Sequence, residues 1–201
     1  MPQVNIAKKE IQFKIVYYGP GMCGKTTNLQ VVHEKMPVKA KGKMASLATS
    51  QDRTLFFDFL PLKAEAIEGF TCKFQMYTVP GQVKYNSTRK LVLRNCDGVV
   101  FVADSQLTKM QENKESLENL EVNLKEQNDS LKEMPLVLQY NERDLPDLAP
   151  IEYMDFLMNN NSVRTPVLEA CALEGTGVLE TLNAIAKLVI QDFVAKKNAG
   201  R

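Results

Sequence analysis

The stretch Gly19-Pro20-Gly21-Met22-Cys23-Gly24-Lys25-Thr26 fits the pattern G-x-x-x-x-G-K-[ST], in which a glycine-rich loop and a lysine surround phosphate groups. It follows the apolar and aromatic run Ile11 to Tyr18, which predicts a strand. It precedes Thr26 to Lys35, whose spacing is compatible with a helix that Pro37 ends. In such a strand-turn-helix setting, successive backbone N–H groups and the helix N-terminus can surround a diphosphate.

This loop assigns roles to particular side chains. We expect Lys25 to reach the β and γ oxygens of a nucleotide and the Thr26 hydroxyl to bind magnesium. Other expected contacts to the nucleotide come from Gly19, Gly21, Met22, Cys23, Gly24 and Thr27. The alternative is a glycine turn whose lysine points to solvent, and the strand-turn-helix context argues against it.

The remaining chain alternates between strand and helix patterns. Further strands are predicted for residues 54–60, 70–78, 99–103, 135–139 and 165–170, and further helices for 110–124, 151–159 and 178–193. Residues 38–53 are polar and small, which predicts a long loop. The alternation predicts an α/β fold of the P-loop NTPase class: one domain over residues 1–201, with a six-stranded, mostly parallel sheet flanked by about five helices.

Composition excludes several classes of function. The 201 residues carry 25 Lys+Arg against 24 Asp+Glu, so the net charge of +1 gives no bulk attraction to nucleic acid or anionic lipid. The four cysteines form no close pairs and His33 is the only histidine, which argues against a zinc site and a Ser-His-Asp triad.

The ends of the sequence and its apolar runs bear on location. We find no signal peptide, no run long enough to span a membrane, no glycine for myristoylation and no terminal cysteine for prenylation. We therefore expect a cytoplasmic protein without a direct membrane anchor. If it visits a membrane, we expect another protein to take it there.

Asn141-Glu142-Arg143-Asp144 follows the strand that ends near Gln139, at the sheet edge where open α/β folds bind ligands. It resembles the Asn-Lys-x-Asp motif with which GTPases read guanine. The resemblance implies that Asp144 accepts hydrogen bonds from the guanine N1–H and 2-amino group, and that Asn141 ties this loop to the phosphate-binding loop. Glu142 replaces the lysine whose stem lies along the nucleotide, which adds negative charge there. A charged turn without this role remains the alternative.

Two further segments carry the same resemblance. Thr78-Val79-Pro80-Gly81-Gln82 resembles the Asp-x-x-Gly-Gln switch of Ras-like proteins, with Thr78 in the aspartate position. In Glu169-Ala170-Cys171-Ala172-Leu173, Ala172 matches the alanine of a Ser-Ala-Lys loop that presents a backbone N–H to guanine O6. A buried turn of small residues would explain the second segment equally well.

From these motifs and their order, the chain resembles small Ras-like GTPases over nearly all its length, and in particular the MglA group of bacterial GTPases that control gliding motility and cell polarity. The segments that carry the resemblance are 17–29, 52–62, 77–82 and 97–105. It implies a Ras-like G domain that binds GTP, GDP and Mg²⁺. It also implies effector and regulatory proteins as partners, an MglB-like activator among them, and recruitment to a cell pole by those partners.

The resemblance also implies the catalytic residues. Gln82 would orient the attacking water, and Arg53 would act as an arginine finger supplied by the same chain. Thr54 would sense magnesium and the γ-phosphate, and so would act as a metal ligand together with Thr26. Thr78 offers a neutral hydroxyl where an aspartate would add charge compensation, so intrinsic hydrolysis should be slow.

Three functions compete at this point. The leading hypothesis is a GTP-hydrolysing molecular switch that binds effectors in one nucleotide state. The alternative is a Ras-like scaffold in which Glu142 and Thr78 have impaired exchange or hydrolysis. A kinase of a small metabolite is disfavoured, because no basic lid for a substrate is apparent and the Asn-x-x-Asp loop would be unexplained.

Overall fold

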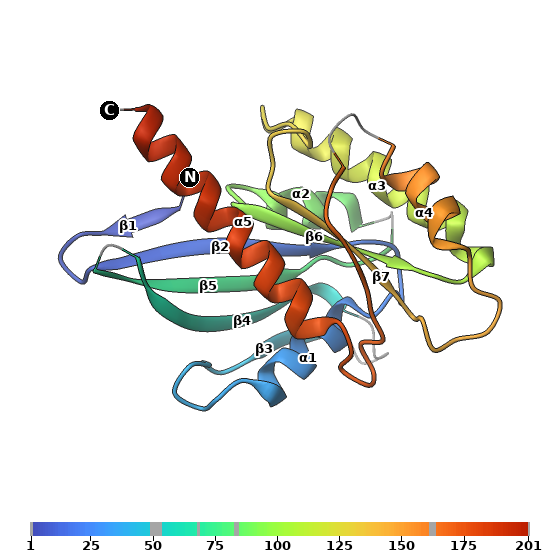
Figure 1. The fold of residues 1–201 in the computed structure, drawn as a ribbon, viewed down its shortest axis with the longest axis horizontal. Helices are drawn as coiled ribbons and strands as arrows, with labels where there is room; N and C mark the ends of the chain where they lie inside the picture. Colours follow the sequence, from blue (N-terminus) through green and yellow to red (C-terminus); the bar gives the residue numbers. More distant parts are fainter. Residues whose placement is uncertain (1, 49–53, 68, 83–84, 161–163, 201) are drawn as a thin grey trace.

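The computed structural model of the chain describes residues 2–48, 54–67, 69–82, 85–160 and 164–200. Within these residues, eight strands form one sheet and five α-helices cover it (Figure 1). The strands are β1 (Gln3–Asn5), β2 (Glu10–Tyr18), β3 (Ala45–Ala48), β4 (Thr54–Ile67), β5 (Phe70–Thr78), β6 (Gly98–Asp104), β7 (Leu136–Asn141) and β8 (Val167–Glu169). The helices are α1 (Lys25–Lys35), α2 (Asn86–Leu93), α3 (Met110–Lys125), α4 (Ile151–Met158) and α5 (Val178–Ala199).

The sheet is mixed but mostly parallel, as expected from the alternation of strands and helices. Its order is β3-β4-β5-β2-β6-β7-β8, and β1 pairs with the beginning of β2. The five strands from β5 to β8 in this order are joined by parallel pairings, whereas β1, β3 and β4 pair antiparallel. The predicted α/β class is confirmed.

The sheet has two short strands in addition to the six expected, β1 and β3. Strand β3 lies within residues 38–53, for which the sequence predicts a loop. Its four residues, Ala-Ser-Leu-Ala, pair antiparallel with β4, which continues to Ile67 and so offers a long backbone edge. Because backbone pairing to a neighbouring strand needs no particular side-chain pattern, a short strand of small residues gives little signal in the sequence.

Both faces of the sheet are buried at β6, at β7 and over the second half of β2. Along β2, Ile15 and Tyr17 pack with α1 and α5, whereas Val16 and Tyr18 pack with α2, α3 and α4. All seven residues of β6 are buried, as its β-branched run Val99–Ala103 predicts for a central strand. Figure 1 shows α5 crossing one face of the sheet. Helices therefore cover both faces of the central strands.

The carboxyl ends of the parallel strands meet at one edge of the sheet. The last residue of β2, Tyr18, is in register with Phe101 of β6, and the last residues of β6 and β7, Asp104 and Asn141, are in register with each other. This alignment brings the loops after β2, β6 and β7 together. In the described part of the chain, no helix is both long and apolar enough to cross a membrane.

Candidate functional site

The phosphate-binding loop, residues 19–26, turns sharply between β2 and α1. Gly24 has a φ of 84° and Gly19 a φ of 148°, which are backbone conformations that residues other than glycine rarely adopt. A Cβ atom on Gly19 would also overlap the carbonyl oxygen of Val102 in β6. Helix α1 then begins at Lys25, and the N-terminus of a helix favours a bound anion.

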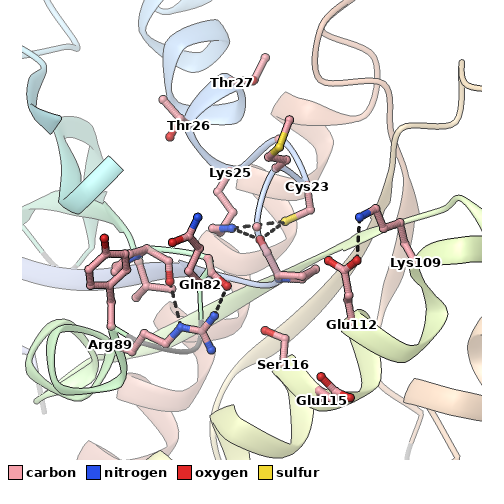
Figure 2. A pocket seen from close by; sticks show the side chains of 18 of the residues that line it. Cys23, Lys25, Thr26, Thr27, Gln82, Arg89, Lys109, Glu112, Glu115 and Ser116 are labelled. Carbon is pink, nitrogen blue, oxygen red and sulfur yellow. Dashed lines mark hydrogen bonds and ion pairs between the residues drawn. The ribbon is translucent and has the colours of Figure 1, made fainter. Parts of the chain in front are cut away.

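The ammonium group of Lys25 lies inside this loop. It donates to the carbonyl oxygens of Gly19, at 3.2 Å, and of Pro20, and it lies 3.5 Å from Sγ of Cys23 (Figure 2). The side chain is only 7% exposed. Carbonyl oxygens offset its charge only in part, so phosphate oxygens in the same position would bind it more strongly.

A cavity of about 720 Å³ opens at the loop, within the range of about 300–1,000 Å³ that is usual for small-molecule sites. One wall is formed by residues 20–27 of the loop and α1, and a second by 79–82 together with Tyr85 and Arg89. The lining is completed by Lys109, Glu112, Glu115 and Ser116 of the α3 region and by Glu142 after β7. The cavity therefore joins the phosphate-binding loop to the segment that carries Gln82.

Gly81 packs directly on the phosphate-binding loop. A Cβ atom at this position would overlap the backbone of Gly21 and the carbonyl oxygen of Pro20. Gln82 follows at once and lines the cavity, and in the view of Figure 2 its side chain lies between Lys25 and Arg89. The residue expected to orient a water is thus held beside the phosphate-binding loop.

Asn141 connects three loops at the sheet edge. Its side-chain nitrogen Nδ2 donates to the carbonyl oxygen of Cys23 at 3.1 Å, and its Oδ1 accepts from the N–H of Ala172 at 2.8 Å. Asn141 is fully buried. The loop after β7, the loop after β8 and the phosphate-binding loop are therefore joined through one side chain.

Glu142 faces the phosphate-binding loop. It has a φ of 62°, it lines the cavity, and its Oε1 accepts from Nδ2 of Asn141 at 3.2 Å. A Cβ atom built on Gly24 would come within 3.1 Å of the same oxygen. Burial, and then the charges of Asp104 and Asp144, raise the pKa of the Glu142 carboxyl. The carboxylate that the sequence analysis singled out therefore lies in the wall of the cavity, beside the phosphate-binding loop.

Asp144 is exposed at the rim, outside the residues that line the cavity, and its carboxylate lies beside the thiol of Cys171. The neighbouring Arg143 connects this loop to the end of β8. Its side-chain Nε lies 2.9 Å from a carboxylate oxygen of Glu169, and its backbone N–H donates to the carbonyl oxygen of Ala170 at 3.1 Å. The N–H of Ala172, which the resemblance directs to a base oxygen, is donated to Asn141 in this structure. A base at this site would share or replace that bond.

Comparisons with known proteins agree with this geometry. The sequence model of the ADP-ribosylation factor family, Arf, matches residues 3–189. The chain belongs to this family. It is 53% identical over 193 residues to "Mutual gliding-motility protein MglA" of Myxococcus xanthus (strain DK1622), which covers 96% of this chain and 98% of that protein. It is also 30% identical over 115 residues to "Ras-related protein rab-39" of Caenorhabditis elegans, 57% of this chain and 43% of that protein.

The chain is therefore a small GTPase of the MglA type with a Ras-like G domain, as the resemblance implied. Guanine nucleotides are the ligands of this family. Regulators and effectors are general partners of small GTPases.

The expected magnesium ligands are described only in part. Thr26 lines the cavity at the start of α1, next to Thr27. Thr54 opens β4, but only its backbone is described, and Arg53 lies outside the described residues. No group of three or more acidic, histidine or cysteine side chains that could hold a metal occurs in the described ranges. The Thr26 hydroxyl is the kind of oxygen donor that Mg²⁺ takes in nucleotide sites, where few ligands come from protein and the rest from phosphates.

Sequence reasoning missed the wall of the cavity opposite the phosphate-binding loop. Arg89 is fully buried in α2, and Glu112, Glu115 and Ser116 come from α3. Charged residues on the surface helices of an α/β fold are normally solvated, so their pattern gives no reason to place them in a cavity. The one available signal is distance in sequence, since Arg89 follows Gln82 by only seven positions.

Proposed function

We propose that this protein is a GTP-binding and slowly GTP-hydrolysing switch that controls cell polarity and gliding motility through nucleotide-dependent binding of effectors. The observation that carries the proposal is the packing of Gly81 on Gly21, which brings the Gln82 segment and the phosphate-binding loop to one cavity. The cellular role follows from the similarity to the gliding-motility protein over nearly the whole length of both chains.

The proposed chemistry divides between binding and hydrolysis. Lys25 turns from the loop carbonyls to the β and γ oxygens, and the N–H groups of the loop and of α1 bind the remaining phosphate oxygens. Thr26 and Thr54 would hold Mg²⁺, which would neutralise part of the negative charge on the phosphate groups. Asp144 reads the N1–H and 2-amino group of guanine, and Ala172 donates to its O6.

Hydrolysis depends on two further side chains. Gln82 orients the water that attacks the γ-phosphate, and Arg53 brings positive charge to the oxygens on which negative charge develops. Thr78, 1% exposed at the end of β5, supplies a neutral hydroxyl in place of a carboxylate, so the intrinsic rate is low. An activating protein of the MglB type would raise this rate by fixing Arg53 and Gln82, and polar recruitment would depend on such partners.

The second candidate is a Ras-like scaffold with impaired nucleotide exchange or hydrolysis. The position of Glu142 favours it, because the carboxylate lies against the loop that must hold phosphates. A scaffold would bind partners equally well in every nucleotide state. The two candidates therefore differ in two measurable properties. A switch releases phosphate from bound GTP and binds partners in only one nucleotide state, whereas a scaffold does neither.

The test is a titration of the purified protein with fluorescent GTP, GDP and ATP, with and without Mg²⁺. The switch requires tight binding of GTP and GDP, no competition by ATP and release of phosphate from bound GTP. Lys25→Ala should lose affinity for both guanine nucleotides, whereas Lys187→Ala on α5, away from the cavity, serves as the matched control. Binding of GTP by Lys25→Ala as tight as by the wild type would contradict the site.

A further inference from the structure

Arg89 carries a buried positive charge that no carboxylate neutralises among the residues the structure describes. The side chain is 0% exposed. Its Nε donates to the carbonyl oxygen of Pro80 at 2.9 Å, its Nη2 donates to the carbonyl oxygen of Gly81, and its Nη1 donates to Oδ1 of Asn119 at 2.8 Å. A buried cation is costly unless its hydrogen bonds are made, so this arrangement holds both carbonyls firmly in place.

The guanidinium group belongs to a network of side chains that we call the Arg89 clamp: Tyr18, Asn86, Arg89, Asn119 and Asn123. The guanidinium carbon lies 5.2 Å from the centre of the Tyr18 ring. The Tyr18 hydroxyl donates to Oδ1 of Asn119 at 2.5 Å and accepts from Nδ2 of Asn123 at 3.0 Å. Both asparagines also donate to Oδ1 of Asn86, at 3.1 and 2.8 Å.

The clamp joins the strand that leads into the phosphate-binding loop to the segment that leads to Gln82. Tyr18 is the last residue of β2, directly before the phosphate-binding loop, and the two carbonyls that Arg89 binds belong to the residues directly before Gln82. On its other side, Gly81 packs on Gly21. The backbone leading to Gln82 is therefore held between Gly21 and Arg89, with α3 as the support.

We infer that Arg89 is a positioning residue for GTP hydrolysis: it fixes the Pro80–Gly81 backbone so that Gln82 faces the phosphate-binding loop. This inference rests on the proposed function of Gln82. It assigns Arg89 no contact with the nucleotide, because its three donating nitrogens are bound to Pro80, Gly81 and Asn119. Lysine cannot reproduce the arrangement, since its single ammonium group cannot form the planar fork that reaches all three acceptors.

The test uses single-turnover hydrolysis of bound GTP by Arg89→Lys. A small displacement of a catalytic group costs up to about a hundredfold in rate, so we expect a loss between about tenfold and a hundredfold. The dissociation constant for GDP should stay within about twofold, because GDP binding does not use Gln82. Lys90→Ala is the matched control in the same helix; Lys90 pairs at the surface with Glu126 and should leave both quantities unchanged.

A double-variant cycle separates positioning from general loss of structure. If Arg89 acts through Gln82, Arg89→Lys should lower the single-turnover rate when Gln82 is present. The same substitution should not lower the rate further in a protein that already carries Gln82→Ala. A further loss of hydrolysis rate in the Gln82→Ala protein would overturn the inference. So would a loss of GDP affinity in Arg89→Lys as large as its loss of hydrolysis rate. If Arg89→Lys does not fold, Asn119→Ala removes one acceptor and keeps the arginine, and it should give a smaller loss of the same kind.

Hydrogen exchange distinguishes failure of this inference from failure of the proposed function. In the Arg89→Lys protein bound to GDP, the amides of Gly81 and Gln82 should exchange faster than in the wild type. If the wild type does not hydrolyse GTP, the proposed function fails, and faster exchange would still support the clamp. Unchanged exchange together with an unchanged hydrolysis rate would overturn the role of Arg89.

Discussion

The side-chain amide of Asn141 donates to the carbonyl oxygen of Cys23 across a distance of 3.1 Å, although the two residues lie 118 positions apart. The same side chain accepts from the N–H of Ala172. These bonds make the shape of the phosphate-binding loop dependent on the loops proposed to read the base. We therefore expect a substitution of Asn141 to affect phosphate binding as well as base recognition.

Asn141→Ala should weaken both the fold and nucleotide binding. The substitution leaves a buried carbonyl and a buried N–H without partners, and each such loss costs about 1–3 kcal/mol. Thermal unfolding with and without GDP measures both effects. Asn183→Ala, at an exposed position of α5, provides a control. A nucleotide affinity unchanged in Asn141→Ala would show that the loops are not coupled.

Gly81→Ala should separate binding from hydrolysis. The new methyl group would overlap the backbone of Gly21, so the segment that carries Gln82 must move away from the phosphate-binding loop. We expect GDP affinity close to that of the wild type and a strong loss of the single-turnover rate. Gly200→Ala, whose Cβ would meet only an ordinary contact at 3.5 Å, is the control. A normal rate in Gly81→Ala would contradict the packing described for this segment.

Glu142→Lys should bind GTP and GDP more tightly. The carboxylate faces the phosphate-binding loop, so replacing it by a cation removes repulsion and restores a long stem beside the nucleotide. Exposed charge effects are about 1 kcal/mol, which corresponds to roughly a fivefold slower release. The difference should shrink as salt increases.

Measured release rates of labelled GDP test the change at Glu142. Glu133→Lys makes the same change of charge before the amino end of β7, away from the cavity, and should leave release unchanged. Identical release from Glu142→Lys and wild type at low salt would show that the carboxylate does not act on the nucleotide.

Glu142→Gln should alter the dependence of stability on pH. Burial and nearby carboxylates raise the pKa of Glu142 above its usual 4.5, so the folded protein holds this proton more tightly than the unfolded chain. The resulting stabilisation is fully present below pH 4.5 and is lost as pH rises through the raised pKa. The melting temperature of Glu142→Gln should therefore exceed that of the wild type at neutral pH, and the gap should narrow in acid. A gap that stays constant with pH would contradict the burial of this charge.

The sequence predicts those parts of the site that local pattern determines. The phosphate-binding loop and the buried run Val99–Ala103 carry their own signals, glycine and lysine spacing in one and continuous β-branched residues in the other. The direction of Glu142 and the burial of Arg89 depend on contacts between elements distant in the chain, with Asn141, Pro80 and Asn119 as partners. Residue identity alone gives no sign of such contacts, and an arginine on a helix would ordinarily be placed in solvent.

Single-turnover hydrolysis of bound GTP shows whether the protein hydrolyses GTP with the help of Gln82. GTP is loaded onto wild type and Gln82→Ala, excess nucleotide is removed, and phosphate release is followed with Mg²⁺ present. A group that orients water acts mainly in the transition state. We expect slow release of about one phosphate per bound GTP by the wild type, and at least about tenfold slower release by Gln82→Ala at unchanged GTP affinity. Equal rates in the two proteins, or no release by the wild type, would contradict it.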